Sequence, residues 1–444
     1  MLRTFKLLTI IAVFGALLMA CSNGNGGTAT NNGSGGATSN NSTQQSEVDK
    51  KEPVTLKVMV ASEWLNEKKW QPIFDAYEQE TGNTIEIQSA PVNNYMDLVN
   101  TRLATKDVPD LLFYWGQEGK IKQLQPSKNL IDLTNEEYTA RITPSVKNYF
   151  LSNEGKLYGI PVTGLNVSGV IYNKKVFNDL GLDIPTTYDE FLATAEAIKA
   201  AGIIPVYEAG KEGWPLQLYT FSAMASVINS QPDVINQVNA NQLTFDQIAD
   251  YVNALQQQYD LKSLGYVNDD LFSATLDMSM EAVATGKAAM IFQADWQIDP
   301  ILTKYPDAEI GMFPQPYGQD AYAGISDPIG LYALADTDNS EVAKEFLAYF
   351  ASEENLTEYF NAVKSIPTWT GLTVELNPGT AEMNEHVEAG KAVPFFNALT
   401  VVEIGDYQGL LQQLYGDKLT AEEVAKNLQE NIKKAAKAAG IEGF

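Results

Sequence analysis

The chain has 444 residues, a formal net charge of −26, one histidine and one cysteine. Such acidity repels a phosphate backbone, and no basic stripe with interleaved aromatic residues is present, so we expect no nucleic-acid partner. One histidine leaves serine–histidine catalysis and histidine-rich zinc sites without their main reagent, and one cysteine excludes an intramolecular disulfide.

The first 20 residues are predicted to be a lipoprotein signal peptide. Arg3 and Lys6 precede a mostly apolar stretch over 7–20, which is shorter than the ~20 residues that a membrane-spanning helix needs. The sequence LMAC at 18–21 is similar to the bacterial lipobox, although Met19 is unusual at its place. The similarity implies that Cys21 carries a diacylglyceryl group. The alternative is an ordinary signal peptide that happens to contain a cysteine.

A flexible linker is predicted over 21–52. Residues 22–46 are nearly all Gly, Ser, Thr, Asn and Gln, so they bury too little apolar surface to offset the entropy of ordering. About 28 such residues reach roughly 30 Å. No later segment approaches the ~18 uninterrupted apolar residues of a membrane span. We therefore expect a protein anchored by the lipid on Cys21 at the extracellular face of the cytoplasmic membrane.

Strands and helices alternate from residue 54 onward. The segment 54–60 alternates like a half-buried strand, 63–81 has helical spacing of apolar residues, and 84–88 is a second strand. A helix over 94–104 and a buried strand over 110–114 follow. This alternation predicts a mostly parallel sheet with helices on both faces, with ligands at the carboxyl ends of the strands.

The predicted strand ends carry aromatic side chains close to carboxylates or amides. Glu63 and Trp64 follow the first strand, Asn93 follows the second, and Trp115 and Gln117 follow the third. A sugar ring has an apolar C–H face and an edge of hydroxyl groups, so its site needs flat apolar surfaces and fixed polar groups together. These strand ends offer that combination.

The pattern restarts in the second half of the chain. Strands are expected over 169–172 and 203–207, and helices over 188–201, 216–228, 245–259, 269–285 and 420–439. The last helix is amphipathic and begins with Thr420, followed by Glu423 in the spacing of a capping box. The body of the chain is long for one hydrophobic core and suits two lobes.

Six segments carry a family resemblance: DLLFYW at 110–115, LYGIPVTGLNVSGVIYNKKVF at 157–177, GKAAMIFQADW at 286–296, AGISDPIGLYAL at 323–334, AKEFLAYFASEENLTEYF at 343–360, and KSIP at 364–367. With them, nearly the whole body resembles the family 1 extracellular solute-binding proteins, the sugar receptors of ABC importers that include the maltose-binding protein. The resemblance implies an α/β, two-lobed periplasmic-binding-protein-like fold of type II topology. Its three interlobe crossings are expected near 164–168, 324–327 and 364–369, with the ligand cleft between the lobes.

The resemblance also implies lobe boundaries and a function. The N-terminal lobe is expected over 53–165 and 328–364, and the C-terminal lobe over 166–327 and 365–444. We expect a monomeric, membrane-anchored binding protein that captures a sugar or oligosaccharide and delivers it to an ABC importer permease by lobe closure. No enzymatic activity, cofactor or metal is expected.

The expected ligand-binding set joins the strand-end residues to positions that the resemblance implies. In the family, positions corresponding to Trp115, Gln117, Asn166 and Trp296 commonly touch sugar, and Asp295 beside Trp296 suits a hydroxyl edge. The full set is Glu63, Trp64, Asn93, Trp115, Gln117, Asn166, Trp214, Asp295, Trp296, Asp327 and Trp369.

Each member of this set has a structural alternative. A tryptophan can pack a helix or lobe surface, as Trp70 is expected to do in mid-helix. Asp327 can be a turn residue, and Asn166 can cap the backbone. The acidic string at 336–341 lacks the glycine and distal glutamate of a calcium loop, so a helix N-cap is favoured there.

Other functions remain open from the sequence. A receptor for a polyamine or a peptide would use the same fold, as would a chemosensor or an adhesin. Glu63, Glu118, Asp295 and Asp327 supply acids that a secreted glycoside hydrolase needs, although their spacing does not demand it.

Overall fold

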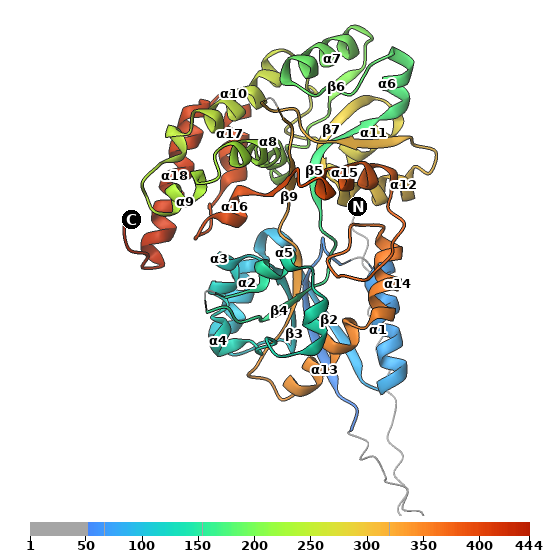
Figure 1. Ribbon diagram of the computed structural model, residues 1–444, viewed down its shortest axis with the longest axis vertical. Coiled ribbons are helices and arrows are strands. Elements are labelled where there is room, and N and C mark those ends of the chain that lie inside the picture. Colours follow the sequence, from blue (N-terminus) through green and yellow to red (C-terminus); the bar gives the residue numbers. More distant parts are fainter. Residues whose placement is uncertain (1–51, 66, 153, 319) are drawn as a thin grey trace, which may run out of the picture. The chain divides into compact units, whose positions relative to one another are not determined.

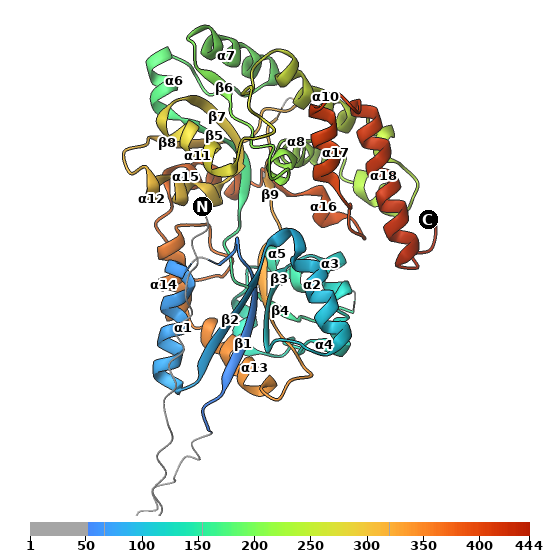
Figure 2. The ribbon, with the colours of Figure 1, turned by 180° about the vertical axis from the view of Figure 1, so that it is seen from behind.

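The computed structural model describes residues 52–65, 67–152, 154–318 and 320–444 (Figures 1 and 2). The predicted signal peptide, Cys21 and all of the predicted linker except Glu52 lie outside the described residues. By its internal contacts, Glu52–Phe444 forms one unit. This unit contains the strands, helices and functional residues described below.

The first sheet has the strand order β2-β1-β3-β10-β4. Its strands are β1 (Thr55–Ala61), β2 (Thr84–Ala90), β3 (Leu111–Trp115), β4 (Gly159–Pro161) and β10 (Ile329–Ala333). β1 is parallel to β2 and β3, whereas β10 is antiparallel to β3 and β4. The predicted strands at 54–60, 84–88 and 110–114 are thus confirmed.

The second sheet has the order β11-β9-β5-β7-β6, and β8 also pairs with β5. Its strands are β5 (Val167–Asn173), β6 (Ile204–Val206), β7 (Ala288–Ala294), β8 (Ile310–Phe313), β9 (Ala323–Ile325) and β11 (Ala392–Pro394). β5 is antiparallel to β7, β8 and β9, whereas β6 is parallel to β7 and β11 to β9.

One strand in each sheet departs from the predicted parallel arrangement: β10 in the first sheet and β5 in the second run opposite to the other strands of their sheet. The reason is that the chain changes lobes twice by running directly from one strand to another. β5 and β10 each enter their sheet from a crossing, at the edge where β1, β3 and β7 end. Each of them therefore runs away from that edge, opposite to its neighbours. The sheets are mixed, while the alternation of strands and helices within each lobe follows the prediction.

Helices pack on both sheets. Those of the first lobe are α1 (Glu67–Thr81), α2 (Val92–Thr105), α3 (Glu118–Gln123), α4 (Pro126–Asn129), α5 (Pro144–Lys147), α13 (Ser340–Phe350) and α14 (Glu353–Val363). Figure 1 shows α1 and α14 on one side of the first sheet and α2 to α4 on the other.

The second lobe carries the remaining helices. They are α6 (Lys174–Leu180), α7 (Tyr188–Ala200), α8 (Gln217–Ser230), α9 (Val234–Asn239), α10 (Ala249–Ser263), α11 (Leu276–Thr285), α12 (Ile298–Lys304), α15 (Pro378–Glu388), α16 (Phe396–Leu399), α17 (Tyr407–Tyr415) and α18 (Ala421–Ala438). α11 begins later than predicted, because Thr275 caps it by accepting a hydrogen bond from the Met278 amide. α18 has the predicted capping box of Thr420 and Glu423.

Aromatic packing fixes α1 in the first lobe. Trp70 is 3 % exposed and stacks on Tyr359 of α14, with ring centroids 4.5 Å apart. Its indole also meets Phe113 of β3 edge to face at 5.2 Å. The core role predicted for Trp70 is confirmed, and this packing sets where the loop before α1 lies.

The described chain passes between the two sheets at three places. The first crossing (162–166) joins β4 to β5, the second (326–328) joins β9 to β10, and the third (364–377) joins α14 to α15. They are tied to one another. The Ser326 amide donates to the Asn166 carbonyl at 3.0 Å, and Leu165 pairs with Ile366 as an isolated antiparallel bridge.

Gly164 is expected to be intolerant of a side chain, because the first and third crossings touch there. A methyl group at this position would lie 2.6 Å from Cβ of Ser365 and 3.0 Å from the Ile366 carbonyl oxygen. We expect Gly164→Ala to lower the free energy of unfolding by ~1–3 kcal/mol, measured by chemical denaturation. Gly119→Ala is the control, because its methyl would meet nothing closer than 3.7 Å. Equal stability of the two variants would contradict the prediction.

Candidate functional site

A pair of indole rings stands where β1 and β3 end. Trp64 and Trp115 are both half-buried, and their ring centroids lie 4.6 Å apart at 86°. Tyr95 of α2 holds them, because its ring meets Trp64 edge to face at 5.4 Å. Its hydroxyl is within donating distance of the carbonyl oxygens of Met59 (2.9 Å) and Phe113 (2.7 Å). The predicted grouping of these two strand ends is thus present.

A lysine side chain lies against one of these two indole rings. Lys120 of α3 places its Nζ 4.2 Å from the centroid of the Trp115 ring. The Gly116 amide donates to the Pro328 carbonyl at 2.7 Å, which ties the end of β3 to the second crossing. Trp115 is therefore held beside a crossing rather than inside its lobe.

Gln117 follows β3, Asp327 lies in the second crossing, Asn397 contacts Gln117, and Glu403 lies close enough to Asp327 to affect its pKa; we call these four residues the acceptor cluster. Gln117 also precedes α3, Asn397 lies in α16, and Glu403 lies before α17. The Gln117 Nε2 donates to the Asn397 carbonyl, which joins the two lobes. A methyl group on Gly119 would lie 3.7 Å from the Val401 carbonyl oxygen and 3.8 Å from that of Thr400, so the start of α3 lies close to this segment of the second lobe.

The acceptor cluster has more acceptors than donors. One oxygen of each member, namely Gln117 Oε1, Asp327 Oδ1, Asn397 Oδ1 and Glu403 Oε1, is covered from solvent and has no hydrogen-bond partner among the described residues. An unpaired buried polar group costs ~1–3 kcal/mol, and such groups are uncommon in folded proteins. The arrangement therefore suits a ligand that brings O–H or N–H donors.

Burial and two neighbouring charges shift the pKa of Asp327. Burial raises its pKa to about 7, the nearby Lys120 lowers it, and Glu403 raises it further. Burial likewise raises the pKa of the Tyr114 hydroxyl, and Glu403 adds to that effect. Tyr114, Lys120 and Glu403 thus belong to the surroundings of Asp327, at the ends of β3 and the second crossing.

A second aromatic group, which we call the Trp296 group, consists of Trp214, Asp295 and Trp296. The sequence 286–296 forms β7 and then the 3-10 helix η5 (Asp295–Gln297), so the indole of Trp296 follows the carboxyl end of β7. Trp214 and Trp296 are half-buried, with ring centroids 6.4 Å apart. The second lobe therefore presents a pair of indoles, as the first lobe does.

Asp295 is the buried member of the Trp296 group. It is 3 % exposed, and its Oδ1 accepts a hydrogen bond from the Val167 amide at 3.0 Å, where the first crossing meets β5. Its Oδ2 is covered from solvent and makes no hydrogen bond of ordinary geometry within the described part of the chain, although the Thr380 hydroxyl lies close enough to lower the pKa of the carboxyl group. Burial raises the pKa of Asp295 to about 7, against the lowering effect of the Val167 amide.

Hydrogen bonds through two crossings connect the two tryptophan groups. Trp296 follows Asp295, whose carboxylate accepts a hydrogen bond from the Val167 amide. The carbonyl of the neighbouring Asn166 accepts a hydrogen bond from the Ser326 amide. Two residues later, Pro328 accepts from Gly116 beside Trp115. Trp115 and Trp296 are thus fixed to the same pair of crossing segments, and neither is buried in the interior of its own lobe.

The remaining predicted site residues have other surroundings. Glu63 is exposed, and its Oε2 accepts from the Val92 amide at 2.8 Å, at the start of α2. Asn93 is exposed on α2. Asn166 is half-buried and acts through its carbonyl. Trp369 is 2 % exposed and donates its Nε1–H to the Pro161 carbonyl at 3.0 Å, so it offers no free ring face.

Several residues of the site have no local signature in the sequence. Lys120, Asn397 and Glu403 belong to none of the motifs described above. Asn397 and Glu403 reach the end of β3 across about 280 residues of chain, as the Gln117–Asn397 contact shows. Glu212 could have been suspected from the sequence, because it lies two residues before Trp214. Its Oε2 is covered from solvent and has no hydrogen-bond partner among the described residues.

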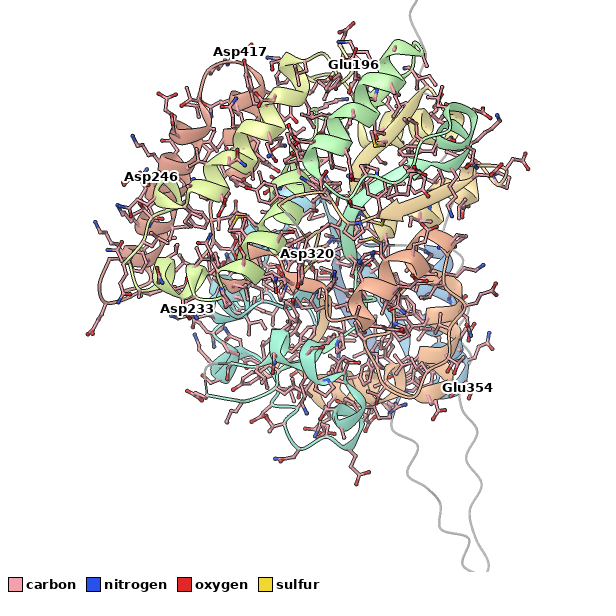
Figure 3. All side chains as sticks on the ribbon, turned by 45° about the horizontal axis from the view of Figure 1, so that its top comes forward. Glu196, Asp233, Asp246, Asp320, Glu354 and Asp417 are labelled. Carbon is pink, nitrogen blue, oxygen red and sulfur yellow. The ribbon has the colours of Figure 1, made fainter. Side chains whose placement is uncertain are left out.

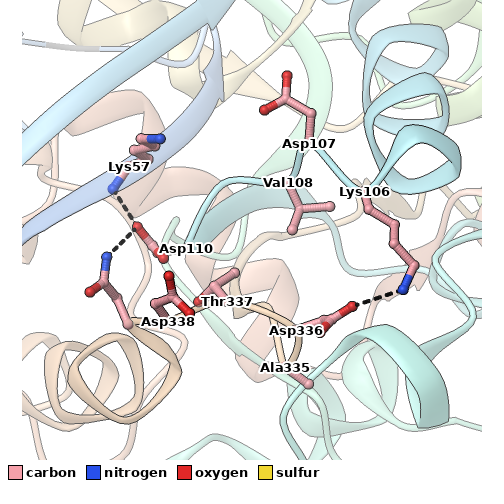
Figure 4. A pocket seen from close by; sticks show the side chains of 10 residues that line it. Lys57, Lys106, Asp107, Val108, Asp110, Ala335, Asp336, Thr337 and Asp338 are labelled. Atoms are coloured by element: carbon pink, nitrogen blue, oxygen red, sulfur yellow. Dashed lines mark hydrogen bonds and ion pairs between the residues drawn. The ribbon is translucent and has the colours of Figure 1, made fainter.

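A hollow of about 400 Å³ lies at the other end of the first sheet (Figure 4). It includes part of the acidic string 336–341. Asp110 Oδ2 accepts from the Lys57 amide and from Asn339 Nδ2 at 2.9 and 3.3 Å, and Lys106 pairs with Asp336 at 3.5 Å. Asn339 is at the N-cap position of α13, but its side chain makes no capping bond.

The parts of the chain that the structure describes contain neither a metal-binding cluster nor a membrane-spanning helix. Within them, no group of three or more His, Cys, Asp or Glu side chains is placed to hold a metal ion. No described helix has the length and apolarity to cross a membrane. Figure 3 shows acidic side chains such as Glu196, Asp233, Glu354 and Asp417 on separate elements of the surface, which suits solubility.

Comparison with known proteins gives a match over most of the chain. A family described as "Bacterial extracellular solute-binding protein" matches residues 62–357. The Multiple sugar-binding protein of Streptococcus mutans is 27% identical over 389 residues, which are 84% of this chain and 84% of that protein. The Melibiose/raffinose/stachyose-binding protein MelE of Bacillus subtilis is 24% identical over 382 residues, 83% of this chain and 86% of that protein.

Solved structures match the fold. A sugar transporter protein of Bacillus licheniformis, in complex with stachyose, aligns with a TM-score of 0.72 at 20% identity. The alignment covers 86% of this chain and 100% of that one. The two-lobed α/β prediction is confirmed by this likeness and by the two sheets.

Proposed function

The chain belongs to the bacterial extracellular solute-binding protein family, and from this premise we propose that it captures a sugar or oligosaccharide and delivers it to an ABC importer permease. The family binds solutes outside the cytoplasm rather than transforming them. Its sugar-binding relatives extend over more than four fifths of this chain.

The acceptor cluster and the two pairs of half-buried indoles, one pair in each lobe, support this proposal. Indole faces suit the C–H faces of a pyranose, and unpaired carboxylate and amide oxygens suit its hydroxyl donors. Trp64 and Trp115 would bind from the first lobe, and Trp214 and Trp296 from the second. Asp295, Asp327 and Gln117 would accept from hydroxyl groups, and Glu63, Asn93 and Asn166 would contribute at the margins.

The names of two relatives support the choice of ligand class. One is named for multiple sugars, and the other for melibiose, raffinose and stachyose. We propose a neutral oligosaccharide of that kind as the ligand. Micromolar affinity requires ~8 kcal/mol, which a few desolvated aromatic faces and several hydrogen bonds supply after the cost of closure.

The remaining parts of the proposal concern architecture and location. We propose that two lobes close around the ligand, the first formed by 53–165 and 328–364 and the second by 166–327 and 365–444. The residues near Trp369 belong to the second range but pack on the first lobe. Closure in response to ligand contacts on both lobes would present one form to the permease. A lipid on Cys21 would hold the monomer at the extracellular face of the cytoplasmic membrane.

Calorimetric titration of the full chain tests the proposal. Raffinose, stachyose and melibiose are titrated beside spermidine and a tripeptide, and thin-layer chromatography follows each sugar for cleavage products. We expect micromolar binding of at least one oligosaccharide without cleavage. Spermidine is included because the site has a surplus of hydrogen-bond acceptors and acidic groups. Binding of spermidine and of no sugar would overturn the sugar assignment. Release of monosaccharides would overturn the receptor assignment.

A further inference from the structure

An ion pair joins the two lobes outside the acceptor cluster and the Trp296 group. Lys69 Nζ of α1 lies 2.7 Å from Asp299 Oδ2 of α12. Their side chains are 15 and 25 % exposed, so the pair is largely shielded from solvent. α1 packs on the first sheet's lobe through α13 and α14, whereas α12 packs on α11 and follows β7. Separation of the lobes would therefore break this pair.

The pair follows directly on the proposed ligand-binding loops. Lys69 is five residues after Trp64, and Asp299 is three residues after Trp296. Each is carried by the first turn of the helix that continues from its tryptophan loop. Because each residue lies within five positions of its tryptophan, a change in the separation of the two tryptophan loops is expected to change the distance between Lys69 and Asp299.

The helix dipoles increase the dependence of Lys69 on its partner. A cation in the first turn of a helix lies at the positive end of the macrodipole, which is unfavourable, whereas an anion there is favoured. Lys69 is in the unfavourable arrangement, and Asp299 in the favourable one. Lys69 therefore gains more from meeting Asp299 than a lysine at an ordinary surface position would gain from meeting an acid.

Within the described chain, other ion pairs connect residues of a single lobe. Lys156 pairs with Asp132 at 3.2 Å in the first lobe, and Lys174 pairs with Glu382 at 2.6 Å in the second. These pairs hold in any arrangement of the lobes. They provide internal controls for the pair between α1 and α12.

We propose that Lys69 and Asp299 form a latch that favours the closed arrangement of the lobes and slows release of the ligand. Neither residue is proposed to touch the ligand, so both are positioning residues. The effect on release rests on the proposed function, whereas the effect on the separation of the lobes does not.

The first experiment measures the separation of the lobes without any ligand. Spin labels are placed at two exposed positions, one in each lobe, by Gln79→Cys and Asn178→Cys in the full chain carrying Cys21→Ser. Pulsed electron spin resonance gives the distance distribution. We expect Lys69→Met to shift population towards longer distances, because methionine keeps the apolar stem and removes the charge. Lys156→Met is the matched control and leaves the distribution unchanged.

The second experiment measures ligand release by stopped-flow tryptophan fluorescence, with raffinose or whichever oligosaccharide the titration identifies. We expect Lys69→Met to raise the dissociation rate by about fivefold, the size that a partly shielded ion pair supports. Asp299→Asn should have the same effect, and the double variant should add little to either single one. Raising the ionic strength should speed release from the parent protein more than from Lys69→Met.

Unchanged distances in Lys69→Met without ligand would overturn the latch. Additive effects of the two substitutions on release would also overturn it, because additivity means that the side chains act independently. Failure of every sugar to bind would contradict the proposed function and leave the distance measurement as the deciding test of the latch. Thermal unfolding of each variant checks that the lobes are folded.

Discussion

Replacement of Trp296 by alanine is expected to weaken oligosaccharide binding by about 100-fold while the protein remains folded. The indole is half-buried at the end of β7, beside Trp214 and next to the buried Asp295. Loss of a central aromatic contact typically costs ~2–4 kcal/mol of binding free energy. A side chain that is not in the core contributes much less to folding. Calorimetric titration gives the affinity, and chemical denaturation gives the free energy of unfolding.

Trp369→Phe is the matched control for that experiment. Trp369 is 2 % exposed and donates to the Pro161 carbonyl, so phenylalanine leaves this buried acceptor unpaired. We expect the free energy of unfolding to fall by ~1–3 kcal/mol and the affinity to remain within about twofold. A loss of affinity in Trp369→Phe equal to that in Trp296→Ala would contradict the separation of roles drawn from their exposure.

The ligand-free protein is expected to lose stability as the pH rises from about 4 to about 7. Asp295 and Asp327 each have a pKa of about 7 in the folded protein, against ~3.9 in an unfolded chain. An acid whose pKa is raised by folding stabilises the folded state only while it is protonated. That stabilisation is fully present below the unfolded pKa and is lost as pH rises through the folded one. For the buried Asp295 the change amounts to ~4 kcal/mol at most.

Asp295→Asn tests this pH dependence. An amide keeps an oxygen for the Val167 amide and cannot ionise, so the variant should be more stable than the parent at pH 8 and gain nothing at pH 4. Urea denaturation at pH 4, 6 and 8 measures the difference. If the free energy of unfolding changed with pH by the same amount in parent and variant, the raised pKa of Asp295 would be contradicted. Ligand affinity should show the opposite trend, because hydroxyl donors favour the ionised carboxylate, so sugar binding should strengthen as pH rises.

The sequence predicted those strands and helices whose formation depends on residues close together in the chain. The first strands were recognisable because their burial alternates or is continuous, and α18 because Thr420 and Glu423 satisfy its first amides. The indoles at the ends of β3 and β7 could be found because a carboxyl strand end is set by the strand itself. Their use as sugar-binding residues remains a prediction.

The sequence did not reveal features that depend on contacts between distant segments. The direction of β5 and β10 follows from passage between lobes, which no strand pattern records. Glu403 and Asn397 join the site because the segment before α17 folds back against α3, again without a local signature. Trp369 was placed at the site from its nearness to a crossing, yet the third crossing keeps it in contact with β4.

The hydrogen bonds that tie the crossings together restrict how the lobes can move. Separate strands would each bend and twist on their own, but Asn166 is bonded to Ser326 and Leu165 to Ile366. The three linked crossings are therefore expected to bend together in one direction and to resist twisting and sliding past one another. Opening and closing then follow one rotational path, so a partner that recognises the shut form meets the same surface each time.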